Sequence, residues 1–272
     1  MQSAVLRRFT PESPLGLSGR RGAEAPRHWP KSVTDVIGRS LLALVIAPVV
    51  SCGAPGPDSA LTPPDTTAEV GRPGLTYDQF LPAGYSLDTT MRWPMILALH
   101  GAGGLIKEDN LIEVEAKHDP AFPFVVIAPR TSSGWHPVEL DQVLVAAQAR
   151  LRIDPDRIYL TGLSMGAYGA WDLAVAYPHR FAALALISGG GSPASACVLD
   201  RLPVWAFANR SDPVVACSES EMIVRAVNAC GGSAALTIYD ELSPGQWAHN
   251  AWQVAWTSPE LYQWFLRSRR AP

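Results

Sequence analysis

The sequence has few cysteines, few charges and no long apolar run, and these shortages limit the kinds of protein that it can be. Four of its 272 residues are cysteine, and neither these nor the six histidines have metal-ligand spacing. No metal site is therefore expected. An apolar run of about a dozen residues, 40–52, is too short to span a bilayer as a helix. Charged residues make up 17% and hydrophobic residues 47%, enough for one large core.

The stretch GLSMG at Gly162–Gly166 is the most informative motif. It matches the G-x-S-x-G pattern and lies between an apolar, β-rich run (157–161) and a helix-like segment (167–177) that ends at Pro178. A strand that turns into a helix this quickly forces its central serine into a cramped backbone conformation, which flanking glycines permit. The context predicts a nucleophile elbow with Ser164 as the nucleophile.

The nucleophile needs a base, and the order of residues limits the choice. Where such a serine lies in a nucleophile elbow between a strand and a helix, an acid and then a histidine follow it along the chain. Only His179 and His249 follow Ser164. His179 would lie about 22 Å of helical rise from the elbow, at the far end of its helix. His249 is therefore the predicted base.

The acid is expected at the end of a strand between the nucleophile and the base. The buried-strand run 202–208 is followed by a turn that contains Asp212, which is the predicted acid. Asp240 and Glu241 are rivals after the next strand, 235–239. A purely turn-forming role for Asp212 before Pro213 also remains open.

A glycine-rich loop predicts the oxyanion hole. The apolar strand 94–99 runs into HGAGG at 100–104, and such a backbone can bring an amide N–H close to a substrate oxygen. The expected donors are the N–H groups of Met165 and of Ala102 or Gly103. The histidine of this loop is expected to organise it by hydrogen bonds. A phosphate-binding loop is excluded because no Lys-Ser/Thr follows, and no cofactor is expected.

The order of elements predicts a mostly parallel sheet covered on both faces. Apolar strands are expected at 95–99, 124–128, 157–161, 183–187, 204–208 and 235–239. Helices are expected at 139–151, 166–177, 218–229 and 258–269. Strands of this kind alternating with helices are typical of α/β proteins. Residues 76–92 are expected to form an opening antiparallel hairpin. Only about fifteen residues separate the fourth and fifth strands, which leaves no room for a large lid.

Six stretches together resemble one family: LPAGY at Leu81, HGAGG at His100, RIYLTGLSMGAYGAWDLA at Arg157, YPHRFAAL at Tyr177, PVWAFANRSDPVV at Pro203 and SPELYQWFL at Ser258. From about residue 77 to the end, the chain resembles bacterial serine esterases of the α/β-hydrolase superfamily. Within this superfamily it resembles the group of feruloyl-esterase-like, polyhydroxyalkanoate-depolymerase-like and "predicted peptidase" lipoproteins. One departure is that Ala248, where relatives usually have glycine, precedes the histidine.

The resemblance implies an α/β-hydrolase fold with a central sheet of about eight strands, helices on both faces and no large lid. It implies hydrolysis of carboxylic esters through a Ser164-Asp212-His249 triad and an acyl-enzyme. Trp135 and Trp247 are candidates for the substrate pocket, although core packing is as good an interpretation for each. The alternatives are a prolyl-oligopeptidase-like peptidase, an acyltransferase, or a non-catalytic binding lipoprotein on the same fold.

The first 75 residues are expected to be separate from the globular domain at 76–272. The run 40–52 has the length of a signal-peptide core and ends in VVSC, which resembles a lipoprotein cleavage box with Cys52 as the lipidated residue. The preceding 39 residues are long for such a segment, which would fit a start annotated too far upstream. Residues 53–75 contain five prolines and are predicted to be a flexible tether. The protein is thus expected to be exported to the cell envelope.

Charge and cysteine positions refine this prediction. Residues 1–51 hold seven of the 22 basic and three of the 25 acidic residues, so the remainder has a net charge of −7. A domain of that sign is not expected to bind nucleic acid or anionic lipid. Cys217 and Cys230 flank a predicted helix and lie too far apart for a disulfide. Any bridge must use Cys197, and free thiols are the alternative.

Overall fold

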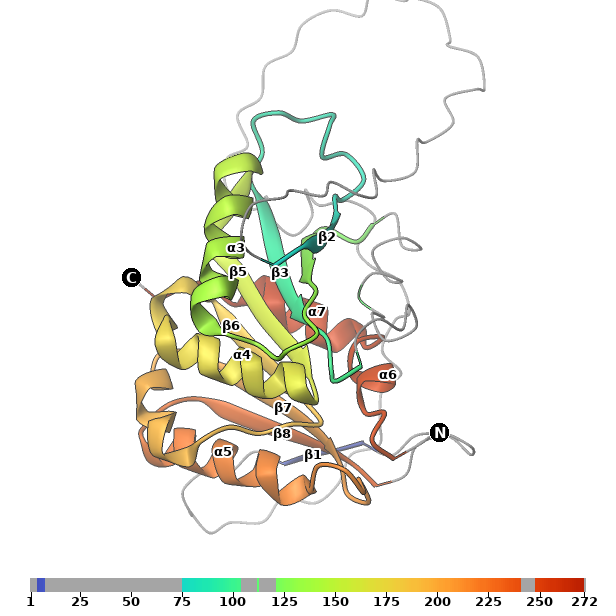
Figure 1. The fold of residues 1–272 in the computed structure, drawn as a ribbon, viewed down its shortest axis with the longest axis vertical. Helices are drawn as coiled ribbons and strands as arrows, with labels where there is room; N and C mark the ends of the chain where they lie inside the picture. The colour runs from blue at the N-terminus through green and yellow to red at the C-terminus, as the bar shows by residue number, and fades with distance from the viewer. Residues whose placement is uncertain (1–3, 8–74, 104–111, 113–120, 241–247, 272) are drawn as a thin grey trace, which may run out of the picture.

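An eight-stranded sheet organises the computed structural model, which describes residues 4–7, 75–103, 112, 121–240 and 248–271 (Figure 1). In spatial order the strands are β1 (Ala4–Arg7), β8 (Ala234–Tyr239), β7 (Val204–Asn209), β6 (Ala183–Ile187), β5 (Ile153–Leu163), β3 (Trp93–Leu99), β4 (Val125–Pro129) and β2 (Tyr77–Phe80). The six central strands are parallel, and β1 and β2 are antiparallel to their neighbours. The prediction of about eight mostly parallel strands is confirmed.

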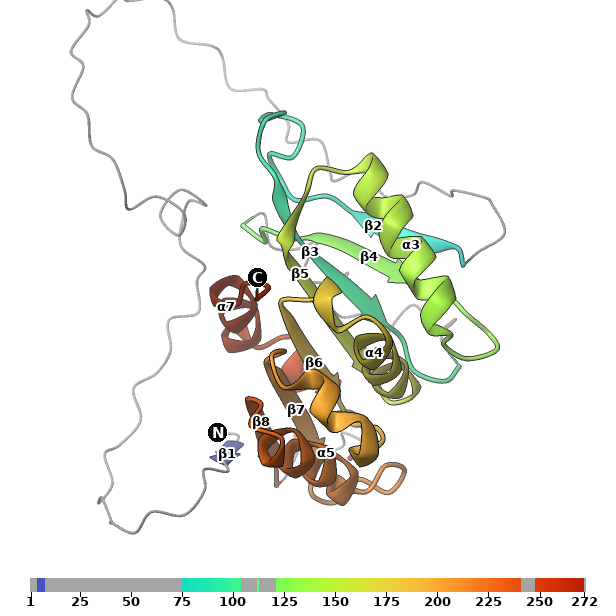
Figure 2. The same ribbon diagram turned by 90° about the vertical axis from the view of Figure 1, so that its left-hand side faces the viewer.

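Helices cover both faces of the sheet, as Figure 2 shows. One face carries α3 (Pro137–Arg150), α4 (Met165–Ala176) and α5 (Cys217–Ala229). The other carries α6 (Trp252–Ala255) and α7 (Pro259–Arg267). Two 3₁₀ helices, η1 (Pro178–Arg180) and η2 (Pro193–Leu199), precede β6 and β7. Among the described residues, no helix is both long and apolar enough to cross a membrane.

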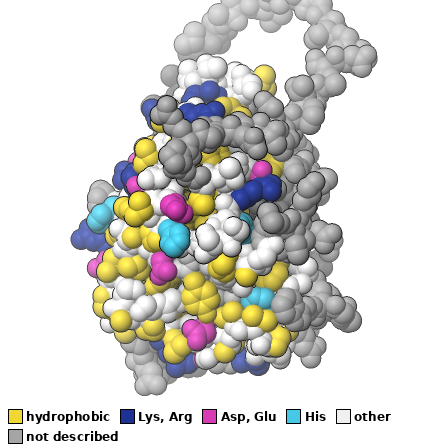
Figure 3. Space-filling model, in the orientation of Figure 1, with side chains coloured by type: hydrophobic (Ala, Val, Ile, Leu, Met, Phe, Trp, Pro, Cys, Tyr) yellow, Lys and Arg dark blue, Asp and Glu magenta, His cyan; other side chains and the backbone are white. Residues whose placement is uncertain are grey.

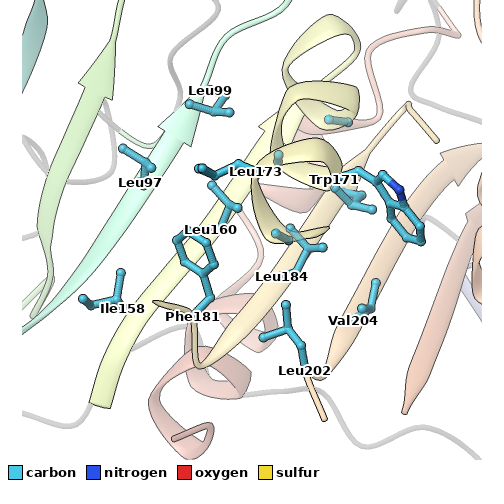
Figure 4. Close-up of a cluster of buried hydrophobic side chains, with 14 of the residues drawn as sticks. Leu97, Leu99, Ile158, Leu160, Trp171, Leu173, Phe181, Leu184, Leu202 and Val204 are labelled. Atoms are coloured by element: carbon cyan, nitrogen blue, oxygen red, sulfur yellow. The ribbon is translucent and has the colours of Figure 1, made fainter. Parts of the chain in front are cut away.

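The central strands are largely apolar because both faces of the sheet are covered. Every residue of β3, β4 and β6 is buried. Figure 4 shows the layer beneath α4, where Trp171 and Leu173 of the helix lie over Leu160 and Leu184 of the sheet. This core fixes the carboxyl ends of β5, β6 and β7 relative to one another.

The predicted elements agree closely with the observed ones, with one error at the start of the domain. Helix ends differ by at most two residues, and β5 begins four residues earlier than expected. The predicted hairpin at 76–92 is wrong, because only β2 forms and it pairs with β4. The rest of that segment is turns: Tyr85 N–H donates to Pro82 O, and the Asp88 carboxylate accepts from the amides of Thr90 and Met91.

Strand β1 was not expected from the sequence, which places residues 1–52 in an export segment. The strand pairs with β8 over four residues, from Ala4 opposite Tyr239 to Arg7 opposite Leu236. It therefore occupies the edge of the sheet that β8 would otherwise present. The predicted apolar run at 40–52, which includes Cys52, lies outside the described residues, and so does the tether at 53–75 except for its last residue.

A disulfide joins Cys197 of η2 to Cys230 at the end of α5, and Cys217 is free. The sequence prediction that any bridge must include Cys197 is confirmed. The bridge fastens the connection between β6 and β7 to the helix that follows β7. That connection, residues 188–203, contains only η2 and is fully described, so it carries no lid domain.

Replacing Cys197 with serine is expected to lower the free energy of unfolding by about 3–4 kcal/mol. The bridge joins residues 33 apart in the sequence, so it closes a loop that lowers the entropy of the unfolded chain. Denaturant unfolding of the full chain measures this loss, with Cys217→Ser as the matched control that leaves the bridge intact. Equal stability of the two variants would contradict a stabilising disulfide.

Candidate active site

Ser164 lies at a sharp turn between β5 and α4, as the motif predicts. Its φ is 50° and its ψ is −120°, a conformation that costs a residue with a side chain on the order of 1–3 kcal/mol. The turn is held on the neighbouring strand by the Ser164 N–H, which donates to the carbonyl of Ile187 at 2.9 Å. The strain is thus maintained by the surrounding sheet.

The two glycines of the elbow allow close backbone contacts that a side chain would prevent. A Cβ at Gly162 would lie 2.1 Å from the carbonyl oxygen of Gly166. A Cβ at Gly166 would lie 2.2 Å from the carbonyl oxygen of Leu99, at the end of β3. Both distances are far below contact distance, so the turn requires glycine at both positions.

The structure brings Ser164, His249 and Asp212 together in one chain of hydrogen bonds. The Nε2 atom of His249 lies 3.0 Å from the Ser164 Oγ, and its Nδ1 atom lies 2.7 Å from the Asp212 Oδ2. The side chains of His249 and Asp212 are 5% and 1% exposed. Water is therefore largely excluded from the His–Asp pair, which strengthens the interaction between them.

The acid and the base are each held by further contacts. The other carboxylate oxygen of Asp212 accepts hydrogen bonds from the amides of Val214 and Val215, at 2.8 and 3.0 Å. These bonds orient the carboxylate toward the imidazole. The indole of Trp252 meets the His249 ring edge-on, with ring centroids 5.2 Å apart. Contacts to both partners therefore restrain the geometry of the pair.

The loop after β3 lies against the elbow, where the oxyanion donors were predicted. A Cβ at Gly101 would lie 3.4 Å from the Cβ of Ser164, so this backbone approaches the serine closely. Ala102 and Gly103 follow at the surface, and Gly103 has a φ of +84°. Met165 is the first residue of α4, where backbone N–H groups have no partner within the helix. Gly104 lies outside the described residues.

His100 organises this loop, as predicted. Its Nδ1 lies 2.7 Å from the carbonyl oxygen of Gly101, and its Nε2 accepts from the Thr131 amide at 3.1 Å. The indole of Trp135 donates to the His100 carbonyl at 3.0 Å and packs against Gly169 of α4. These contacts give Trp135 the core-packing role that the sequence left open beside a pocket role. Trp247 lies outside the described residues.

The rival residues lie elsewhere. His179 is in η1, at the far end of α4. Asp240 pairs with Arg210 in an exposed ion pair, 2.6 Å between the Arg Nε and the carboxylate. Glu241 lies outside the described residues. Among the described residues, no group of three or more His, Cys, Asp or Glu side chains could hold a metal ion.

Cys217 is the free thiol nearest to the site in sequence, five residues after Asp212. Burial, reinforced by the nearby carboxylate of Glu221, raises the pKa of this thiol. Less thiolate is then present at neutral pH, and the thiolate is the reactive form. We expect iodoacetamide to alkylate Cys217 more slowly in the folded protein than in urea at pH 7, and Cys217→Ser to keep wild-type activity. Rapid alkylation that abolishes activity would contradict this assignment.

Sequence reasoning missed three supporting groups. Trp252 stands three residues after His249 without a motif that marks it, and the amides of Val214 and Val215 carry no sequence signal. Ser188, at the end of β6, donates its hydroxyl to the carbonyl oxygen of His249 at 2.9 Å. Its only signal was a serine directly before three glycines.

Comparison with known proteins finds similarity to esterases. Residues 131–262, which include Ser164, Asp212 and His249, match the family model described as esterase PHB depolymerase. The chain is 28% identical over 172 residues to "Probable feruloyl esterase C" of Aspergillus terreus, covering 58% of this chain and 60% of that protein. It is 42% identical over 120 residues to poly(3-hydroxyalkanoate) depolymerase C of Paucimonas lemoignei, covering 36% of this chain and 28% of that protein. The chain thus spans between about a quarter and three fifths of these relatives.

Solved structures extend the likeness to about seven tenths of the chain. A thermostable esterase is 26% identical and covers 72% of this chain and 60% of its own, with a TM-score of 0.65. An S-formylglutathione hydrolase from Staphylococcus aureus, 13% identical, shares the fold with a TM-score of 0.56, over 71% and 93% of the two chains. With its sheet order and its strained serine turn, the chain has the α/β-hydrolase fold that these solved structures share.

Proposed function

We propose that the protein is a serine hydrolase that cleaves carboxylic esters through a Ser164-His249-Asp212 triad and an acyl-enzyme intermediate. The observation that carries the proposal is the continuous chain of hydrogen bonds from Ser164, at the strained turn, through His249 to Asp212, whose carboxylate and its histidine partner are buried. The match to an esterase family model over the same residues supports the choice of esters.

In the first half of the reaction, His249 takes the proton of the Ser164 hydroxyl as the Oγ attacks the ester carbonyl. Asp212 orients the imidazole and stabilises the imidazolium that forms. The tetrahedral intermediate then collapses. The protonated imidazole gives its proton to the leaving alcohol, and the acyl group remains on Ser164.

In the second half, His249 takes a proton from water, which attacks the acyl-enzyme. The second tetrahedral intermediate collapses with return of the proton to Ser164, and the carboxylic acid leaves. In both halves the negative oxygen would be held by the N–H groups of Met165 and of Ala102 or Gly103. The close approach of Gly101 to Ser164 supports this assignment.

Several features favour a soluble or polymeric ester as substrate. The connection between β6 and β7 carries no lid, and the matched relatives include a depolymerase and a feruloyl esterase by name.

The net charge of −7 beyond residue 51 argues against nucleic acid as a partner. On the face in Figure 3, acidic and basic side chains are interspersed instead of gathered by sign.

The proposal is tested with p-nitrophenyl esters from acetate to decanoate and the full chain. We expect hydrolysis above the buffer rate, and the chain length of the best substrate measures the acyl pocket. A folded protein that cleaves aminoacyl-p-nitroanilides but none of the esters would instead support the peptidase alternative. Inactivity toward both would support the binding-protein alternative.

We further propose export and anchoring through a lipid on Cys52, with residues 53–75 as a tether to the catalytic domain at 76–272. The Cys197–Cys230 disulfide supports export because such bridges persist in oxidising compartments. Cleavage before Cys52 would also remove β1 from the sheet edge.

The lipid anchor is tested by expression in a bacterium that is fed labelled palmitate. The label should be incorporated into the wild type and not into Cys52→Ser. Labelling of both, or of neither, would contradict the anchor.

A further inference from the structure

Ser188 shares an unusual backbone conformation with Ser164. Among the described residues, these two serines are the only non-glycine residues with positive φ, at 48° and 50°. A side chain disfavours positive φ, and glycine adopts it without penalty. Three glycines follow Ser188 directly, yet this strained position is occupied by a serine. Retained strain at one position points to a use for its side chain.

The side chain of Ser188 is buried and hydrogen-bonded to the backbone of the proposed base. Its Oγ donates to the His249 carbonyl at 2.9 Å, and the residue is 1% exposed. Its N–H donates to Phe207 O of β7 at 2.8 Å, and the preceding carbonyl of Ile187 accepts from Ser164 N–H at 2.9 Å. Two adjacent residues at the end of β6 therefore contact the nucleophile turn, the strand before the acid and the loop of the base.

His249 depends on such an anchor because it is carried by a connecting segment. It lies between the end of β8 and the start of α6, outside any helix or strand. Its ring must keep two bonds at once, 2.7 Å to Asp212 and 3.0 Å to Ser164. Misplacement of a reacting group by about 1 Å can slow a reaction by about 100-fold.

We propose that Ser188 is a positioning residue: its hydroxyl holds the backbone of His249 so that the imidazole reaches Ser164 and Asp212 together. The proposal rests on the proposed esterase function. This role gives a reason for a side chain at a position with a φ of 48°, where glycine would carry no strain.

Two substitutions separate positioning from strain. Ser188→Gly removes the hydroxyl and relieves the positive φ, and Ser188→Ala removes the hydroxyl and keeps the strain. We expect both to lower kcat for p-nitrophenyl acetate by about 10- to 100-fold with little change in KM. We expect Ser188→Gly to melt near the wild-type Tm and Ser188→Ala to melt lower. A wild-type kcat in folded Ser188→Gly, or a loss confined to KM, would overturn the proposal.

Ser220→Ala is the matched control. Ser220 is also buried, and its hydroxyl also donates to a backbone carbonyl, but that carbonyl belongs to Gly189, at 2.7 Å, and not to His249. This variant is expected to lose Tm and keep the wild-type kcat. An equal fall in kcat would mean that loss of a buried serine hydrogen bond in this region slows catalysis without acting through His249, and would contradict a specific role for Ser188.

A double-variant test shows whether Ser188 acts through the imidazole. Labelling of Ser164 by a fluorophosphonate needs the activated serine but no ester turnover. Ser188→Gly should slow labelling in the wild type and have no further effect in His249→Ala. Additive slowing would overturn the proposal. A wild type that labels but cleaves no ester refutes the ester function alone, and the labelling rates still decide the role of Ser188. A wild type that does neither refutes both.

Discussion

Ser164→Ala is expected to lower kcat for p-nitrophenyl acetate by a factor on the order of 10⁴ or more. The change removes only the Oγ that lies 3.0 Å from the Nε2 of His249. Because alanine at this position has the same backbone preferences as serine, the strained turn and the fold should persist. Kinetics on the full chain and a thermal melt measure the two expectations.

The control for this prediction is the behaviour of the base. His249→Ala should cause a loss of similar size, and the double variant should be no slower than either single one, because the two residues act as a unit. Ester hydrolysis that survives in folded Ser164→Ala would place the nucleophile elsewhere. Multiplying losses in the double variant would mean that the two residues act independently.

Asp212→Asn carries the second largest expected effect, a fall in kcat on the order of 10⁴. An amide N–H in place of the carboxylate oxygen would favour the His249 tautomer that carries its proton on Nε2, which could not accept the proton of Ser164. The neutral amide could also no longer stabilise the imidazolium. The Val214 and Val215 amides can still donate to the remaining oxygen, so the turn should keep its shape.

Asp240→Asn is the matched control because Asp240 was the rival acid in the sequence. Its ion pair with Arg210 is exposed, and exposed pairs contribute little to stability. Activity within about twofold of the wild type is expected, since the change touches no proposed catalytic group. A larger loss in Asp240→Asn than in Asp212→Asn would exchange the roles of the two carboxylates.

The elements and the site were predictable where local pattern determines structure. Gly162 and Gly166 flank a serine between an apolar strand and a helix, and that spacing forces a tight turn. Asp212 follows the apolar strand β7, and the carboxyl ends of parallel strands meet at one edge of a sheet. His249 followed from the order of residues along the chain. Each of these inferences needed only sequence neighbours and the topology of a parallel sheet.

What the sequence could not supply depends on contacts between distant segments. The pairing of β2 with β4 depends on tertiary contacts, and residues around Asp88 form a turn where the expected hairpin would need a second strand. The partner of Cys197 depended on where the end of α5 lies. The hydroxyl of Ser188 reaches a residue 61 positions away through a backbone angle that no periodicity reveals.

The most direct test of the central claim is to identify the residue that reacts. The full chain is treated with a fluorophosphonate, residual ester hydrolysis is followed, and the adduct is mapped by peptide mass spectrometry. The account predicts one phosphonyl group per chain, on Ser164, with activity lost in proportion to labelling. An adduct on another residue, or full activity after complete labelling of Ser164, would contradict it.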